Sequence, residues 1–297
     1  MLKLKIKNNL TTTFKILFAV IILLIAAGCS KLQTDVPSAQ VITIHKTGIT
    51  NPGSSNFHGN LVRLNGWDMS TCTQCHASNY SGGIAEVNCL NCHTNTGGPE
   101  ACNTCHGEFN NITRIAPPKD VSKNIVTDSA GVGAHVKHLY DNQLGSEILC
   151  STCHKVPQDV YDPEHVDSDL PAEIVFGNLA IHDGGANAGY NFSNATCSDV
   201  YCHGSFEFLK DSAGANSWIY TDSLIVGNAY APKWNKVDGS EAICGSCHLL
   251  PPTGHQNAGN DPNATTCATC HPGVVDANGN IIDQTKHING IKNVFGN

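Results

Sequence analysis

The sequence predicts a mostly irregular chain with short α-helices and few short strands, whose core is formed by bound cofactors rather than by side chains. Three observations lead to this prediction. Aromatic residues make up only 6% of the 297 residues, and charged residues only 14%. Glycine occurs 28 times, which favours turns over long regular elements. The third observation is a unit of two cysteines followed directly by a histidine, which occurs seven times.

This repeated unit uses 14 of the 15 cysteines. Six copies read C-x-x-C-H, and the seventh has four residues between its cysteines. The cysteine pairs are Cys72 and Cys75, Cys89 and Cys92, Cys102 and Cys105, Cys150 and Cys153, Cys197 and Cys202, Cys244 and Cys247, and Cys267 and Cys270. C-x-x-C-H is the attachment signature of c-type haem: each thiol forms a thioether, and the adjacent histidine binds the iron. The sequence therefore predicts seven haem c groups and the haem-dominated core of a multihaem cytochrome c.

The 15 histidines divide into two sets. Seven follow the cysteine pairs and are the predicted proximal iron ligands: His76, His93, His106, His154, His203, His248 and His271. Methionine is a poor candidate for the opposite side of the iron, because Met1 is lost with the leader and Met69 lies three residues before Cys72. The predicted distal ligands are His45, His58, His135, His138, His165, His255 and His287, with His182 to spare. Since Met/His ligation raises haem potential, ligation by two histidines predicts a low-potential series.

Other chemistry fits these residues less well. C-x-x-C pairs also bind zinc, and loop-rich secreted chains often contain disulfides, but neither explains a histidine directly after every pair. The wider Cys197–Cys202 spacing needs a longer loop to reach one haem; the alternative is that Cys197 is free or paired elsewhere. His135 and His138 are three residues apart, so on a helix they would share one face and serve two neighbouring haems, or a stray metal ion instead.

The N-terminus has the features of an export signal. Lysines precede an apolar run of 12 residues, Ile16 to Ala27, which is too short to span a bilayer comfortably. Small residues then lead to Cys29, the one cysteine outside the motifs, as in a bacterial lipobox. We predict a lipoprotein signal peptide over 1–28, lipidation of Cys29 and a tether over 29–40; an ordinary cleaved signal is the alternative. The predicted location is the outer membrane, on its periplasmic or cell-surface face.

The spacing of the motifs divides the remaining chain. Motifs beginning at 72, 89 and 102 predict a three-haem module over 41–118, followed by a linker over 119–130. Motifs beginning at 150, 197, 244 and 267 predict a four-haem module over 131–297, which contains the CxxxxCH motif. Within the second module the sequence predicts a short helix in Gly131–Asn142 and a brief strand at Glu173–Leu179.

The charge balance argues against one class of partner. Without residues 1–28, which hold four lysines and no acids, 13 basic and 25 acidic residues remain, a formal charge of −12. No basic stripe is present, so nucleic acid is not a predicted partner. The expected partners are other redox proteins or extracellular electron acceptors, with the membrane reached through the lipid anchor. The protein could also assemble with copies of itself as a homo-oligomer, or with a porin in a porin–cytochrome conduit.

The order of the motifs resembles that in multihaem c-type cytochromes of the Geobacter type, with mixed CxxxxCH and CxxCH motifs. The segments that carry the resemblance are FHGN (57–60), CTQCHASNYSGG (72–83), CLNCH (89–93), ACNTCHG (101–107), GAHVKHL (133–139), CSTCHKVP (150–157), HVDSDLPAEIVF (165–176), CSDVYCHG (197–204), CGSCHLLPPTGH (244–255), CATCHPGVVDANGNII (267–282) and HING (287–290). The resemblance implies extracytoplasmic electron transfer by low-potential haems. It names no partner.

Three functions follow from these observations. The leading hypothesis is an electron carrier in which haems form a hopping chain and no residue is catalytic. A multihaem oxidoreductase is less well supported, because it needs one iron with an open coordination position. The eight histidines outside the motifs are enough to give each of the seven irons a second ligand, so no iron has to stay open. A subunit of a haem filament is the third hypothesis, with the spare histidine binding a haem of the neighbouring subunit.

Overall fold

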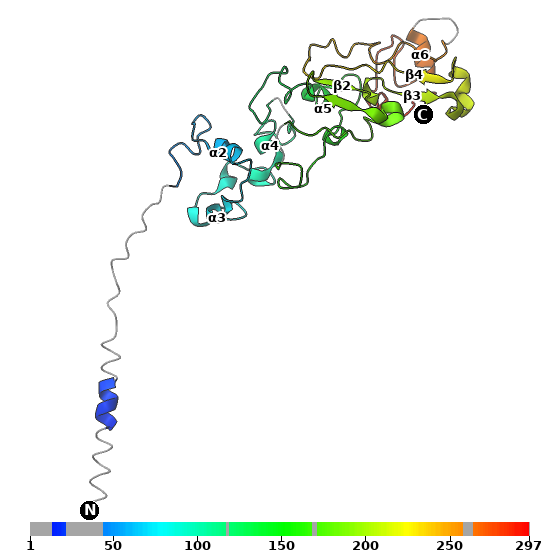
Figure 1. The fold of residues 1–297 in the computed structure, drawn as a ribbon. Coiled ribbons are helices and arrows are strands. Elements are labelled where there is room, and N and C mark those ends of the chain that lie inside the picture. The colour runs from blue at the N-terminus through cyan, green and yellow to red at the C-terminus, as the bar shows by residue number, and fades with distance from the viewer. Residues whose placement is uncertain (1–13, 22–43, 117–118, 168–170, 258–263, 297) are drawn as a thin grey trace, which may run out of the picture. The chain divides into compact units, whose positions relative to one another are not determined.

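The computed structural model describes residues 14–21, 44–116, 119–167, 171–257 and 264–296 (Figure 1). It contains two units, Met1–Leu61 and Val62–Asn297, which are described separately. Cys29, the predicted tether over 29–40 and most of the predicted signal peptide lie outside the described residues. The module boundaries near 118 and 131 stay a prediction.

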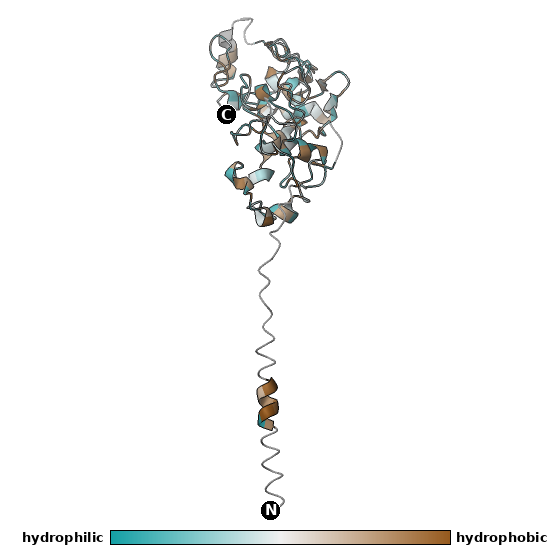
Figure 2. Ribbon diagram, turned by 90° about the vertical axis from the view of Figure 1, so that its left-hand side faces the viewer, coloured by the Kyte–Doolittle hydropathy of each residue, from teal (hydrophilic) through white to brown (hydrophobic). Residues whose placement is uncertain are grey.

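In the first unit, residues 14–21 are helical and exposed, and Figure 2 shows how hydrophobic this short helix is. No helix within the described residues is long and apolar enough to cross a membrane. Residues 47–50 and 52–56 form turns that lead into helix α2 (His58–Leu64). The imidazole Nδ1 of His58 lies 2.9 Å from the Ile49 carbonyl oxygen, which ties the start of α2 to the preceding turn.

The second unit is built from short elements. Its α-helices are α3 (Thr73–His76), α4 (Cys102–Cys105), α5 (His135–Leu139) and α6 (Ala264–Cys270). Its 3-10 helices are Gly83–Ala85, Cys89–Asn91, Gly98–Glu100, Cys150–Thr152, His182–Asn187, Tyr201–His203, Lys210–Ser212, Gly214–Ile219 and Gln284–Lys286. The expectation of a mostly irregular chain with short helices and few strands is confirmed.

Four short strands in the described part of this unit form two antiparallel pairs. Strand β1 (Gly189–Asn191) pairs with β2 (Thr196–Ser198), with Tyr190 opposite Cys197. Strand β3 (Glu207–Leu209) pairs with β4 (Leu224–Val226), with Phe208 opposite Ile225. Each strand has only three residues, so the sheets provide local ties rather than a layer on which helices could pack.

One of the two local predictions is right. Helix α5 lies within the predicted Gly131–Asn142 segment. The predicted strand at Glu173–Leu179 is wrong, because its hydrogen bonds reach a motif turn instead of an extended partner. The Val175 N–H donates to the Cys153 carbonyl at 2.9 Å, and the Gly177 N–H donates to the Thr152 carbonyl at 2.9 Å.

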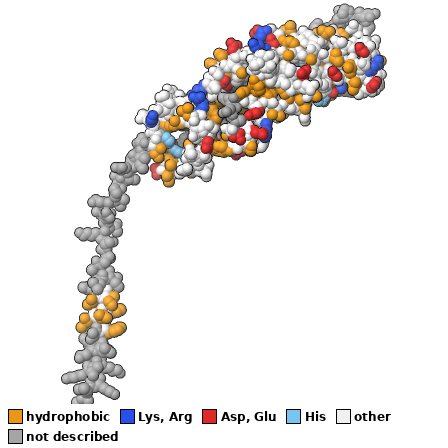
Figure 3. All heavy atoms as spheres, viewed as in Figure 1, with side chains coloured by type: hydrophobic (Ala, Val, Ile, Leu, Met, Phe, Trp, Pro, Cys, Tyr) orange, Lys and Arg blue, Asp and Glu red, His pale blue; other side chains and the backbone are white. Residues whose placement is uncertain are grey.

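The side-chain core is small in the part of the chain that the structure describes. Ile219, Tyr220 and Ile225 form a buried cluster, with Phe206 and Phe208 packed against it. The largest fully buried side chain is an amide, that of Asn103. Many large apolar side chains reach solvent instead, and Figure 3 shows hydrophobic atoms between the charged ones on the surface.

Candidate haem-binding sites

Most attachment motifs share one backbone turn. In five of the described C-x-x-C-H motifs, the histidine N–H donates to the carbonyl of the first cysteine at 2.8–3.0 Å. A bond between residues four apart closes one turn of α-helix. Residues three and four apart lie on the same side of such a turn, so the turn gathers the second thiol and the imidazole beside the first thiol. The motifs concerned begin at Cys72, Cys89, Cys102, Cys150 and Cys267.

The widened motif, which is the fifth in chain order, is built differently. Cys197 lies in strand β2, whereas Cys202 lies in the 3-10 helix Tyr201–His203. The His203 N–H donates to the Val200 carbonyl at 3.0 Å, so the turn begins inside the motif. The two extra residues therefore allow the two thiols to come from a strand and a helical turn.

The sixth motif in chain order, Cys244–His248, consists of turns and bends tied to residues 228–230, a segment here called the strap. The Asn228 N–H donates to the Cys247 carbonyl at 2.8 Å. The Asn228 side-chain amide donates to the carbonyls of Gly245 and Ser246, each at 3.0 Å. Asn228 thus holds the backbone of this motif in place, as the helical turn does in the five motifs described first.

The same strap holds the fifth motif against the sixth. The Ala229 N–H donates to the Gly204 carbonyl, and the Tyr230 N–H donates to the His203 carbonyl, each at 3.0 Å. Gly204 has φ +89°, and a Cβ atom at this position would lie 1.8 Å from the Cys247 carbonyl oxygen. Only glycine allows this approach, so the two motifs are held in direct backbone contact.

Within the described ring contacts, five motif histidines each face a histidine outside the motifs. The ring centroids lie 6.1–6.4 Å apart in every case. The pairs are His106 with His165, His154 with His135, His203 with His138, His248 with His287, and His271 with His255. The sequence predicts one ligand of each type per iron, and each pair contains one of each.

This separation suits an iron between two imidazoles. Because a metal–imidazole nitrogen bond is about 2 Å long, two such bonds in line place the nitrogens about 4 Å apart and the ring centroids about 6 Å apart. The donor set and its separation therefore fit haem iron.

Backbone carbonyls fix which ring nitrogen carries the proton in eight of the ten paired histidines. A carbonyl only accepts, so a ring nitrogen hydrogen-bonded to it carries the hydrogen. Nδ1 donates in this way at 2.7–2.9 Å from His135, His138, His154, His165, His248, His255 and His271, and His287 donates to the Leu144 carbonyl. The Nε2 lone pair is left to bind a metal, as in other histidine sites oriented by a second partner.

Burial shifts the pKa of groups in the paired sites. It lowers the pKa of His135 and of His203 to about 4. It raises the pKa of Cys197 to about 11 and that of Cys202 to about 12. The imidazoles are therefore held neutral, which is the form that binds a metal.

The first two motifs lie close to each other in the chain fold. The Cys89 N–H donates to the Tyr80 carbonyl at 3.1 Å, which anchors the second motif beside the first. A cavity of about 520 Å³ opens next to the second motif and is lined by His93, Leu90 and Tyr80 among others. The ring of Phe109 meets that of His93 edge-on at 5.2 Å.

Three predicted site histidines remain to be placed. His45 and His58 lie in the Met1–Leu61 unit, and their role as distal iron ligands stays a prediction. His182 has a different environment from the paired histidines. Its Nδ1 lies 2.9 Å from Asp183 Oδ2, and its ring lies 5.3 Å from that of Tyr201.

Residues 196–248 match the Geobacter CxxxxCH...CXXCH motif family. The chain carries this family's motif. The matched stretch runs from strand β2 to His248, so it contains the fifth motif, the sixth motif and the strap that joins them. The match supports a multihaem c-type cytochrome, and the C-x-x-C-H motifs indicate covalent binding of haem c. Neither a curated protein nor a solved structure matches the chain.

Sequence reasoning missed the groups that orient the ligands. The carbonyls that accept from Nδ1 belong to residues of unrelated types, such as Val132, Glu173 and Asn293, so no motif marks them. Trp234 contacts both His135 and His138. The sequence offers three tryptophans and no sign of which one lies at a ligand.

Proposed function

We propose that the protein is an exported electron carrier with seven covalently attached, low-potential haems, each ligated by two histidines, which pass electrons from one to the next. The observation that carries this proposal is the set of facing histidine pairs at 6.1–6.4 Å. When bound, haem supplies reversible one-electron chemistry. The chain supplies the attachment thiols, the neutral imidazoles and the surroundings that set the potentials.

Apolar side chains beside the motifs support covalent haem at these positions. Leu149 precedes the fourth motif and is 73% exposed, and Ile243 precedes the sixth and is 61% exposed. Leu249 and Leu250 follow the sixth motif and are also exposed. Burying apolar surface gains about 25 cal/mol per Å². An apolar macrocycle at each motif would cover these side chains and complete a haem-dominated core.

One pair supports a continuous series through both predicted modules. His106 belongs to the last motif of the predicted three-haem module, whereas His165 lies in the predicted four-haem module. Their rings lie 6.2 Å apart with an angle of 25° between their planes. The Met69 N–H also donates to the Tyr161 hydroxyl at 3.1 Å, which joins the same two regions.

The predicted export and anchoring belong to this proposal. Lipidation of Cys29 would hold the carrier at the outer membrane, within reach of other redox proteins or extracellular acceptors. We expect wild-type protein in the membrane fraction and Cys29→Ala protein in the soluble periplasmic fraction. If both variants are soluble, the anchor is wrong while the haem proposal stands.

Mass spectrometry and electron paramagnetic resonance together test the haem proposal. The mature protein should carry seven haem masses. Its oxidised form should show only low-spin ferric signals, because every iron has two nitrogen ligands. Six haems would show that the Cys197–Cys202 motif is not an attachment site. A large high-spin signal would indicate an open iron and favour an oxidoreductase instead.

A further inference from the structure

The paired histidines have two different arrangements. The ring planes are near parallel in His106–His165 (25°), His135–His154 (23°) and His255–His271 (36°). They are strongly crossed in His138–His203 (75°) and His248–His287 (68°). The two crossed pairs contain the motif histidines of the stretch that matches the motif family, residues 196–248.

Helix α5 presents one ligand of each arrangement. His135 belongs to a near-parallel pair and His138 to a crossed pair, although they lie in one short helix. The ring of Trp234 contacts both. It meets His135 edge-on at 4.7 Å and 89°, and it stacks on His138 at 5.6 Å and 29°. One indole therefore limits the rotation of both imidazoles.

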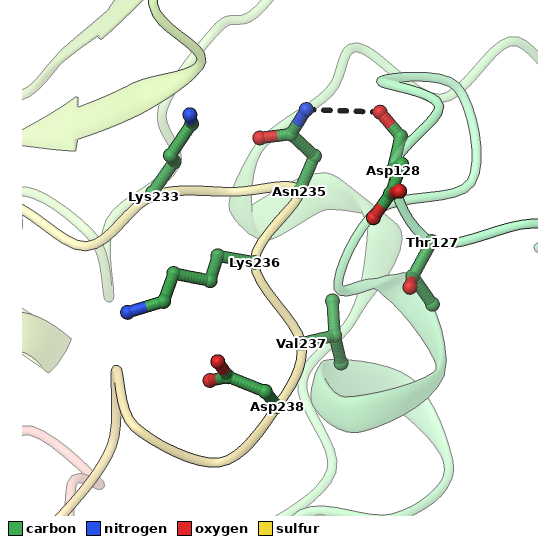
Figure 4. Close-up of a pocket in the computed structure, with 7 residues that line it drawn as sticks. All are labelled: Thr127, Asp128, Lys233, Asn235, Lys236, Val237 and Asp238. Carbon is green, nitrogen blue, oxygen red and sulfur yellow. Dashed lines mark hydrogen bonds between the residues drawn. The ribbon is translucent and has the colours of Figure 1, made fainter.

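The indole is itself fixed from several sides. Trp234 Nε1–H donates to the Ala130 carbonyl at 2.7 Å, and its backbone N–H donates to the Ala195 carbonyl at 2.6 Å. A Cβ atom at Gly133 would lie 2.0 Å from Trp234 Nε1, so only glycine permits this approach. Figure 4 shows the next residue, Asn235, donating to the Asp128 carbonyl, a bond of 2.9 Å.

We propose that Trp234 is a positioning residue that sets the ring planes of His135 and His138, and so makes the irons of the fourth and fifth motifs magnetically different. The inference rests on the proposed function, since it requires iron between the paired rings. Two iron d orbitals can interact with the π systems of the imidazoles. Parallel imidazole planes interact mainly with one of these orbitals and so separate the two in energy. Crossed planes interact with both orbitals equally, which leaves them close in energy and makes the electron g-values more anisotropic. Partners that fix the orientation of a ligand ring are one of the means by which a protein tunes a bound metal.

The test compares Trp234→Phe and Trp234→Ala with Trp218→Phe in the full-length, haem-loaded protein. Trp218 is 55% exposed and lies beside Phe295, so it serves as the matched control. The readouts are the haem number by mass and the low-temperature resonance spectrum of the oxidised protein. In both Trp234 variants we expect the highly anisotropic signal to lose one haem equivalent, that of the His138–His203 pair. The spectral change should be larger in Trp234→Ala than in Trp234→Phe. The signal from the His248–His287 pair and the Trp218→Phe spectrum should not change.

The outcomes separate this inference from the function on which it rests. Native protein with high-spin iron or without haem would overturn the proposed function itself. Low-spin native protein whose spectrum is unchanged in both Trp234 variants would overturn only the role of Trp234. If a variant loses haem, a loss confined to the Cys150 and Cys197 attachment peptides supports positioning at these two sites. A uniform loss over all motifs indicates general unfolding and contradicts it.

Discussion

Residues 62–130 and residues 189–257 hold their motifs by different means. The later region has both strand pairs and the buried cluster of Ile219, Tyr220 and Ile225. The earlier region is described as short helices and turns, and its buried residues include Met69, Tyr80, Ala101 and Asn103. The comparison teaches that the stretch around the widened motif has a small side-chain core of its own, whereas the earlier motifs depend on other ties.

Those ties are mainly polar. The Asn103 side chain donates to the Phe109 carbonyl at 2.7 Å and accepts from the Asn95 amide at 3.3 Å. The Tyr80 hydroxyl donates to Glu100 at 2.6 Å. Hydrogen bonds fix loops but bring little net stability, because they replace bonds to water. The earlier region should therefore depend more strongly on haem than the later one.

Withholding haem should have the largest effect. Ordering the backbone costs about 1–2 kcal/mol per residue, and a chain with so little buried apolar surface cannot offset that. We expect protein produced without haem attachment to lack a cooperative thermal transition in circular dichroism. In limited proteolysis mapped by mass, cleavage should begin within 62–130 and reach 189–257 last. Equal protection of the two regions would mean that the comparison is wrong.

Removing one distal histidine should change one iron. In His165→Ala the iron bound by His106 loses its predicted second ligand and becomes high-spin, while the other six stay low-spin. The measurement is the high-spin intensity in electron paramagnetic resonance, calibrated as haem equivalents. His182→Ala is the matched control and should give no high-spin signal, because His182 lies against Asp183. High-spin iron in the control would show that the predicted spare histidine is a ligand.

The histidines show how far sequence reasoning reaches. The motifs mark every proximal candidate, and the spacing of His135 and His138 on one helix face predicts two neighbouring sites; in the structure these residues face His154 and His203. The partner of His106 could not be predicted, because the described residues between it and His165 include the irregular segments at 107–116, 119–134 and 140–149. Pairing at this range depends on the path of turns, which leaves no periodic pattern in the sequence.

The brief strand predicted at Glu173–Leu179 fails for a related reason. Apolar residues such as Ile174, Val175 and Phe176 favour extended backbone. A strand nevertheless requires an extended partner, and here the neighbouring backbone is the helical turn of the fourth motif. Local propensity could not show that this segment would lie against a motif turn, where no strand is present to pair with it.

Substituting Gly204 should test the backbone contact inside the family motif. Gly204→Ala places a methyl group against the Cys247 carbonyl and forces alanine to φ +89°. We expect a loss of about 3 kcal/mol in the free energy of unfolding, from backbone strain and overpacking together. Denaturant unfolding followed at the haem absorbance measures it.

Gly239→Ala is the control for this substitution. Gly239 has φ +87°, and a Cβ atom there would meet nothing within 4 Å. Backbone strain alone should cost about 1 kcal/mol at this position. Equal losses at Gly204 and Gly239 would mean that the close contact between the fifth and sixth motifs does not contribute to stability.

Two asparagine substitutions compare the regions most directly, with the smallest expected effects. Asn103 is only 1% exposed, and Asn103→Ala removes the amide that donates to the Glu108 and Phe109 carbonyls. The Phe109 carbonyl keeps only the longer bond from the Asn95 amide, at 3.4 Å. Asn228→Ala removes two bonds to the sixth motif at an exposed position, where water can replace them. Leaving buried polar groups unpaired costs about 1–3 kcal/mol, whereas an ordinary hydrogen bond contributes about 1 kcal/mol. We therefore expect Asn103→Ala to lower the free energy of unfolding by about 2 kcal/mol and Asn228→Ala by less than half as much. A larger loss for Asn228→Ala than for Asn103→Ala would contradict the comparison. It would show that the earlier region does not depend on its polar side-chain bonds more than the later region does.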